Sequence, residues 1–410
     1  MWELIRANKR NSIFLMVVMA AVLLLLGFVI GMAFFGQEGG MFGLMIATAI
    51  WLVLTLVSLS SGDQILLAAS RAKLVTHEVH PQLFNVVEEM KIAAALPAMP
   101  KIYIINDPAP NAFATGRNPK NASVAVTAGL LARLNRDELQ GVIAHEISHI
   151  VHRDILFVTL AGIMLGSIVL LSQVFLRGMF YSSMGGSRRR YSSGGKGGGQ
   201  AQIVMLVIAI VAAIVAPMMA YLLYFALSRR REYLADAGAA RLTRYPEGLA
   251  SALEKIAGDP SPQLAAVNKV TAPMYIVNPF KKKKQMKLSD LTSTHPPISE
   301  RVKILRNMSQ GASFKQYSDA FTNVTHQKTV VPVAALSTKE DVALRQAGAE
   351  TAKKGRADKQ TRQVGDIMRM VNQFIFLTCA CGLKLKIPPN FKSNNVKCPR
   401  CKKMHDLPRK

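Results

Sequence analysis

Four long apolar blocks constrain the fold of this chain more than any other feature. They cover residues 12–35, 41–60, 155–176 and 202–227. A helix of about 20 apolar residues is long enough to cross the hydrocarbon core of a bilayer. Half of the residues are hydrophobic, yet the formal net charge is +26 and the basic residues gather between the blocks. A nucleic-acid-binding protein could carry this charge but not these blocks, so we expect a multi-pass membrane protein.

The first two blocks form a predicted hairpin that turns at residues 36–40. Arg6, Lys9 and Arg10 precede the first block, and Arg71 and Lys73 follow the second. Basic residues favour the cytoplasmic side, so the N-terminus is predicted to be cytoplasmic. A cleaved signal peptide is the alternative, but its apolar core would be shorter.

The second pair of blocks flanks a Gly/Ser/Arg-rich loop at residues 178–200. The arginines of this loop oppose its placement outside the cytoplasm, so the blocks are either full spans or a re-entrant hairpin. Their length favours spans. Both arrangements return the chain to the same side. The expected location is the cell inner or plasma membrane, with both termini and the domain built from the segments that follow each hairpin in the cytoplasm.

The segment between the two hairpins has the pattern of a folded domain. A helical pattern within 77–101 is followed by predicted strands at 101–105, 111–116 and 122–126. Thr127 is predicted to cap a short helix that ends near Leu134.

The next helix carries the most informative motif, an HExxH sequence. Asn135 and Glu138 form a predicted capping box that starts this helix. His145 and His149 are then one turn apart on one face, so both rings can bind one ion. Glu146 is placed to take a proton from a metal-activated water. The alternative is a core helix with two satisfied histidines. His152 lies about 10.5 Å along the axis from His145, too far to share its ion.

A third ligand must come from another part of the chain, and Glu232 is the candidate. It follows the fourth apolar block, and Asp236 lies one helical turn later. A glutamate from a second helix completes many sites in which HExxH supplies two ligands. Asp236 could orient a ligand histidine through its outer N–H. A solvated acidic face is the alternative, but the hairpin returns Glu232 to the membrane surface that holds His149.

In combination, these motifs resemble the HtpX-type membrane proteases, a zinc peptidase family that includes the CaaX prenyl endopeptidases. The resemblance covers about residues 1–310 and includes HEISH, REYLAD, Asn111-Ala112-Phe113 and the Ser293–Pro297 segment with Glu300-Arg301. It implies a zinc ion bound by His145, His149 and Glu232, with Glu146 as general base. It also implies that His295 and Arg301 lie near the site, where they could stabilise an oxyanion.

The resemblance implies an endopeptidase for the quality control of membrane or misfolded proteins. Residues 111–114 (Asn111, Ala112, Phe113 and Ala114) are a candidate edge strand for aligning substrate, although an ordinary hairpin remains open. A prenyl-protein endopeptidase is an alternative enzyme, and a non-catalytic membrane scaffold is an alternative of a different class. The expected partners are protein substrates and the lipid bilayer rather than nucleic acid, and the oligomeric state stays open.

The C-terminal part goes beyond a minimal HtpX-type protease. The basic run Lys281–Lys284 is either a solvated loop or a contact for anionic lipid. Residues 310–365 are predicted to form a polar linker with one helix at 338–354. Two close cysteine pairs then suit a structural zinc site in a ribbon, with disulfides or free thiols as alternatives. The four residues are Cys379, Cys381, Cys398 and Cys401.

The predicted fold class is a mainly α membrane protein that contains a zincin-like α+β metallopeptidase domain. About four membrane helices and a small C-terminal zinc ribbon complete it, with one catalytic and one structural Zn²⁺. The first membrane hairpin is predicted at 1–62, the first part of the peptidase domain at 63–154 and the second membrane hairpin at 155–227. The second part of the peptidase domain is predicted at 228–310, the linker at 311–370 and the ribbon at 371–410.

Overall fold

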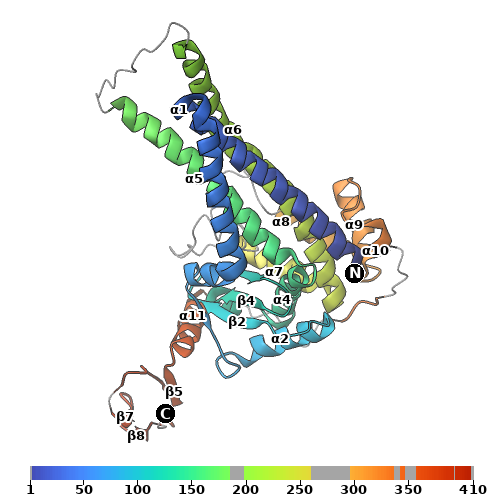
Figure 1. Ribbon diagram of the computed structural model, residues 1–410. Coiled ribbons are helices and arrows are strands. Elements are labelled where there is room, and N and C mark those ends of the chain that lie inside the picture. Colours follow the sequence, from blue (N-terminus) through green and yellow to red (C-terminus); the bar gives the residue numbers. More distant parts are fainter. Residues whose placement is uncertain are drawn as a thin grey trace.

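A computed structural model describes residues 2–184, 198–259, 296–336, 342–346, 357–391 and 393–407. Long helices rise from one side of a mixed domain of helices and a small sheet (Figure 1). The C-terminal strands lie on the side of this domain away from the long helices (Figure 1). The basic run at 281–284 lies outside the described residues.

The long helices contain the four predicted apolar blocks. Helix α1 covers Trp2–Ala69 and turns back at Gly36, whose φ of 71° suits glycine. Helices α5 (Asp154–Met184) and α6 (Gly198–Thr243) form the second pair. Within the residues that the structure describes, four stretches are long and apolar enough to cross a membrane. Large apolar side chains such as Leu25, Leu56 and Val211 are exposed along them, as expected of surfaces that face lipid.

A four-stranded sheet forms the base of the mixed domain, in the order β1-β2-β4-β3. The strands are β1 (Ala72–Leu74), β2 (Lys101–Ile105), β3 (Ala112–Gly116) and β4 (Ala122–Thr127). Strand β4 pairs with β2 in parallel and with β3 antiparallel. The three predicted strands are confirmed. The helix predicted within 77–101 is shorter, because α2 covers only Pro81–Ala93.

Two short-range signals from the sequence hold in the structure. Helix α3 (Ala128–Arg133) begins at Thr127, whose side chain accepts a hydrogen bond from the backbone N–H of Leu130. Helix α4 (Arg136–Val151) begins with the predicted capping box between Asn135 and Glu138. Helices α7 (Pro246–Gly258) and α8 (Ile298–Arg306) then cover α4 and α6, and these packed helices fix the positions of the site residues.

Among the described residues, two large hydrophobic cores and two smaller clusters hold the fold together. The larger core joins the sheet, α2–α4, α7 and α8, with Ile104, Val126 and Ile143 fully buried. The second core joins the membrane helices through residues such as Leu15 of α1, Ile168 of α5 and Ala213 of α6. Helix α1 packs along both α5 and α6, so the first hairpin is tied to the second.

The predicted linker at 311–370 contains a helix that packs into the larger core, which the sequence reading missed. Helix α9 (Phe314–Thr325) starts with a capping box between Ser313 and Gln316. Its Tyr317 and Phe321 are buried, because the apolar side chains of α9 recur at helical spacing and form one face. The short helix α10 (Val333–Leu336) follows.

The helix predicted at 338–354 is wrong where the structure describes that segment. Residues 342–346 are irregular, and their backbone bonds run to other elements. Val342 O accepts from Ala312 N, and Arg345 N donates to Arg244 O. These bonds replace the internal bonds of a helix. Helix α11 (Ala357–Val371) follows, with Ile367 and Met368 in the larger core.

Four short strands form the C-terminal unit. Strand β5 (Ile375–Thr378) pairs with β6 (Lys384–Ile387), and β7 (Asn395–Lys397) pairs with β8 (Met404–Asp406). Each antiparallel pair has two of the four cysteines in its turn. This arrangement is consistent with the predicted ribbon, and α11 attaches it to the mixed domain by packing on α3.

The packing of α9 predicts that it is needed for stability. Phe321 packs its ring edge-on against Tyr233 of α6, with the ring centroids 5.0 Å apart. Phe321→Ala is expected to destabilise the fold by about 3–5 kcal/mol, the usual cost of removing a buried phenylalanine. The check is the thermal unfolding midpoint in detergent. Lys315→Ala, on the exposed side of α9, is the matched control, and equal midpoints for both variants would contradict this packing role.

Candidate active site

The candidate site begins with two histidines on α4. His145 and His149 are one turn apart, and their rings meet edge-on with centroids 4.8 Å apart. Their Nε2 atoms are 3.3 Å apart, a distance that places both atoms close to one common point. His145 is fully buried and His149 is partly buried. His152 is not in the group of ligand atoms that could share an ion, as the sequence predicts.

Helix α6 adds a carboxylate to this pair. Glu232 Oε2 lies 3.6 Å from His145 Nε2, and Glu232 Oε1 lies 3.6 Å from His149 Nε2. The two helices approach closely because Gly238 of α6 faces Ser148 of α4. A Cβ at Gly238 would lie 2.5 Å from the Ser148 Oγ atom. The second hairpin therefore returns Glu232 to the histidines, as the sequence analysis predicts.

The spacing of these three ligands fits a zinc ion. Donors held about 2.0–2.1 Å from zinc in a tetrahedron are about 3.3–3.4 Å from one another. The observed spacings between the three groups are 3.3, 3.6 and 3.6 Å. Two neutral imidazoles and a carboxylate are a common donor set for catalytic zinc and leave a fourth position for water or substrate.

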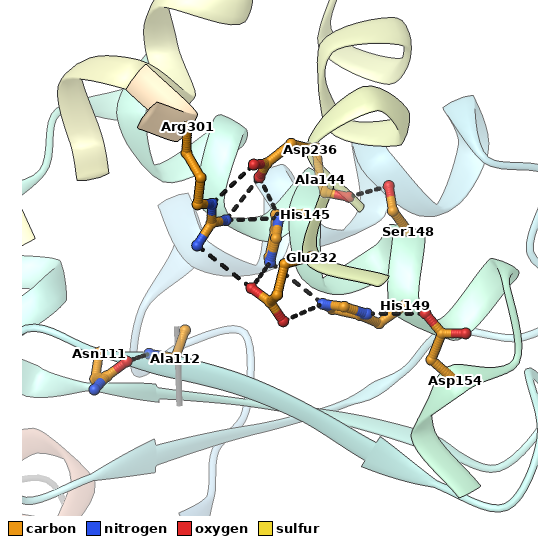
Figure 2. Close-up of polar contacts among 10 residues, drawn as sticks. All are labelled: Asn111, Ala112, Ala144, His145, Ser148, His149, Asp154, Glu232, Asp236 and Arg301. Atoms are coloured by element: carbon orange, nitrogen blue, oxygen red, sulfur yellow. Dashed lines mark hydrogen bonds and ion pairs between the residues drawn. The ribbon is translucent and has the colours of Figure 1, made fainter. Parts of the chain in front are cut away.

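Each candidate ligand histidine has its own carboxylate on the outer side. Asp236 Oδ1 lies 3.0 Å from His145 Nδ1, and Asp154 Oδ2 lies 3.1 Å from His149 Nδ1. Figure 2 shows these contacts as one chain from Asp236 through both histidines to Asp154. A carboxylate that accepts the Nδ1 proton leaves the Nε2 lone pair available for a metal. The role expected of Asp236 has a matching contact, whereas Asp154 was missed by the sequence reading.

Arg301 of α8 completes the outer layer. Its Nε and Nη2 atoms donate to the two oxygens of Asp236 at 2.8 and 2.7 Å, and Nη1 lies 3.3 Å from Glu232 Oε2. Arg301 is fully buried. The family resemblance implies that Arg301 could stabilise an oxyanion. The structure does bring it to the site, but its fork binds Asp236, which favours an orienting role. His295 lies outside the described residues.

The buried charges shift the pKa values of two central groups. Burial raises the pKa of Glu146 above its ordinary value, and the nearby Glu232 carboxylate adds to this effect. The two histidines and the Ala114 backbone act in the opposite direction but do not cancel it. Burial lowers the pKa of His145, but hydrogen bonds to Asp236 and Glu232 outweigh this and raise it to about 9. The carboxylates around His145 therefore favour positive charge at this site.

The candidate substrate strand lies at the edge of the sheet. Strand β3 pairs only with β4 within the sheet, and it packs against α4. The backbone of Ala114 hydrogen-bonds to Glu146, so this part of the edge faces helix α4. Asn111 accepts from the N–H of Ala112 at 3.1 Å and shapes the start of the strand (Figure 2). All five strand residues are buried, Phe113 among them.

The four cysteines form a second group of possible metal ligands. The Sγ atoms of Cys379 and Cys401 are 3.2 Å apart, and those of Cys381 and Cys398 are 3.7 Å apart. Sulfur ligands of one tetrahedral zinc lie about 3.8 Å apart, so the arrangement fits that ion. No disulfide joins these four cysteines in the structure.

Comparison with known proteins agrees with this geometry. The sequence profile of peptidase family M48 matches residues 77–309, which contain all of the candidate catalytic residues discussed above. The chain belongs to peptidase family M48.

Several M48 relatives resemble the chain closely. A "Protease HtpX homolog" from Dictyoglomus turgidum is 45% identical over 309 residues, which cover 75% of this chain and 95% of the relative. The homologue from Dictyoglomus thermophilum is 46% identical with the same coverage. The homologue from Listeria innocua is 44% identical over 75% of this chain and its own full length. No solved structure matches the chain.

These findings confirm that this M48 peptidase is a membrane zinc metalloendopeptidase of the HtpX type. The M48 profile ends at residue 309, so α9, α11 and the cysteine unit follow the family domain in the chain.

Proposed function

We propose that this peptidase cleaves membrane or misfolded proteins at the cytoplasmic face of the membrane, as a protein quality-control enzyme. The convergence of His145, His149 and Glu232 on one point is the observation that carries the proposal. The basic residues Arg10 and Lys73 flank the first hairpin on the side of the mixed domain, which supports a cytoplasmic site.

In this proposal His145, His149 and Glu232 hold the catalytic zinc. When bound, the zinc ion lowers the pKa of water and polarises the scissile carbonyl. Asp236 and Asp154 accept the outer protons of the two histidines and fix their tautomers. Arg301 holds Asp236 in place with two charge-assisted hydrogen bonds.

Glu146 is the proposed general base. Its carboxylate accepts a proton from the attacking water and then passes it to the leaving amine. Burial raises the pKa of Glu146 above its ordinary value, which makes the carboxylate a stronger base towards the attacking water. The edge of β3 near Ala114 is the proposed place where the substrate backbone lies, because this edge faces Glu146.

A digest with and without a chelator tests the proposed function. The full chain in detergent should cleave casein and a model membrane protein. A zinc chelator should stop cleavage, and added zinc should restore it. Cleavage that continues after the metal has been removed would overturn the proposal. Casein and a prenylated peptide should be compared in parallel, since preference for the prenylated peptide would favour a CaaX-type activity instead.

We also propose that the four cysteines bind a structural zinc. Cys379→Ala should reduce the zinc content from two ions to one per chain, because three thiolates hold zinc less well than four. Casein cleavage should remain, since the cysteine unit lies apart from the catalytic helix (Figure 1). Metal quantification checks this prediction, and an unchanged zinc content would contradict it.

A further inference from the structure

The first membrane helix contacts the candidate metal site through buried polar side chains. Asn8 of α1 is only 6% exposed, and its Nδ2 donates to Asp154 Oδ1 at 2.8 Å. The other oxygen of Asp154 lies 3.1 Å from His149 Nδ1. One carboxylate is therefore held by α1 on one side and holds a ligand histidine on the other.

A second contact links the same face of α1 to the other ligand helix. Ser12 lies one turn after Asn8, so the two side chains share a face. Arg231 of α6 donates from Nη2 to Ser12 Oγ at 2.8 Å. Arg231 directly precedes Glu232. The N-terminal turns of α1 thus contact Asp154, which lies against His149, and Arg231, which precedes Glu232. His149 belongs to α4 and Glu232 belongs to α6.

The loss of these contacts would leave buried polar groups without hydrogen-bond partners. A buried amide without a hydrogen-bond partner destabilises the folded state, and an unpartnered buried carboxylate destabilises it more. Asn8 and Asp154 satisfy each other only while α1 stays docked. Without Asn8, Asp154 loses the bond that fixes one of its oxygens, and it then holds the ring of His149 less firmly. Removal of such an outer partner typically weakens metal binding by about 10- to 100-fold.

We propose that Asn8 is a positioning residue for the catalytic zinc, which acts through Asp154 on His149. Retention of the metal thus depends on the docking of the first membrane helix. This inference rests on the proposed role of His149 as a zinc ligand.

The test measures the affinity of the full chain in detergent for the catalytic zinc, by competition with a chelator. The catalytic zinc is identified as the ion that the Glu232→Ala variant lacks. Asn8→Ala should weaken this affinity by about 10- to 100-fold. Asn8→Asp keeps the size of the side chain but places a carboxylate against Asp154, so it should weaken the affinity at least as much. Asn11→Ala, on the same helix and partly exposed, is the matched control and should change little.

A double-mutant cycle separates positioning from general stabilisation of the fold. In an Asp154→Ala background, Asn8→Ala should have no further effect on zinc affinity, because the path to His149 is already broken. Two independent losses that simply add would overturn the inference. Unchanged affinity in both Asn8 variants would overturn it as well. If Glu232→Ala loses no zinc, the proposed metal site itself fails, which is a different result.

Discussion

Glu146→Gln is expected to abolish cleavage and to leave the zinc content unchanged. The substitution keeps the size of the side chain but removes its ability to accept a proton. General base catalysis contributes about 10²- to 10⁴-fold to a rate, so activity should fall by at least that factor. Glu146 is not one of the three grouped ligands, so the metal should stay. Casein cleavage and metal quantification on the same preparation check both parts.

The control for this substitution is Glu88→Gln on the exposed face of α2. This substitution makes the same chemical change at a position far along the chain from the HExxH sequence. The Glu88→Gln variant should therefore cleave casein like the wild type. A Glu146→Gln variant that still cleaves at a similar rate would remove Glu146 as the base. A variant that loses both zinc and activity would indicate that Glu146 serves the metal site instead.

Glu232→Ala is expected to lose both the catalytic zinc and the activity. The side chain supplies one of three ligands, and its removal leaves two histidines and the buried Arg301 beside an incomplete site. Zinc content should fall from two ions to one per chain, and cleavage should become undetectable.

Asp236→Asn is the graded comparison for Glu232→Ala. Asp236 contacts His145 and Arg301 rather than the point where the ligands meet. Its loss should therefore weaken zinc binding by about 10- to 100-fold without abolishing it. Equal zinc content in Glu232→Ala and wild type would contradict the ligand role of Glu232.

Much of the candidate site could be predicted because its signals are local. The capping box at Asn135 and the spacing of His145 and His149 both lie within one helix. Glu232 required one further step, namely that a membrane hairpin returns the chain to its starting side. This step needed only the lengths of the apolar blocks.

Asp154 and Asn8 were missed for two different reasons. Asp154 lies just beyond α4, after Arg153 with a positive φ of 58°, and no helical periodicity predicts where its side chain points. A carboxylate five residues after the second ligand histidine was the available signal. Asn8 has no such signal, because its partner is 146 positions away and only the packing of α1 on α5 brings the two together.

The region after residue 309 was harder still to predict. Its polar composition favoured a linker, although Tyr317 and Phe321 give α9 one strongly apolar face. A short amphipathic helix is stable only when a partner covers that face, and the partner here is α6 with α8. The sequence contains the pattern, but the tertiary contact decides whether the helix forms.

X-ray absorption at the zinc edge reports directly whether His145, His149 and Glu232 bind a zinc ion. The sample is a variant with all four cysteines replaced by serine, so that only the catalytic ion contributes. We expect one zinc per chain with nitrogen and oxygen neighbours at about 2.0–2.1 Å and the outer-shell scattering of two imidazoles. A chain without zinc, or an ion with fewer than two imidazole neighbours, would contradict this expectation.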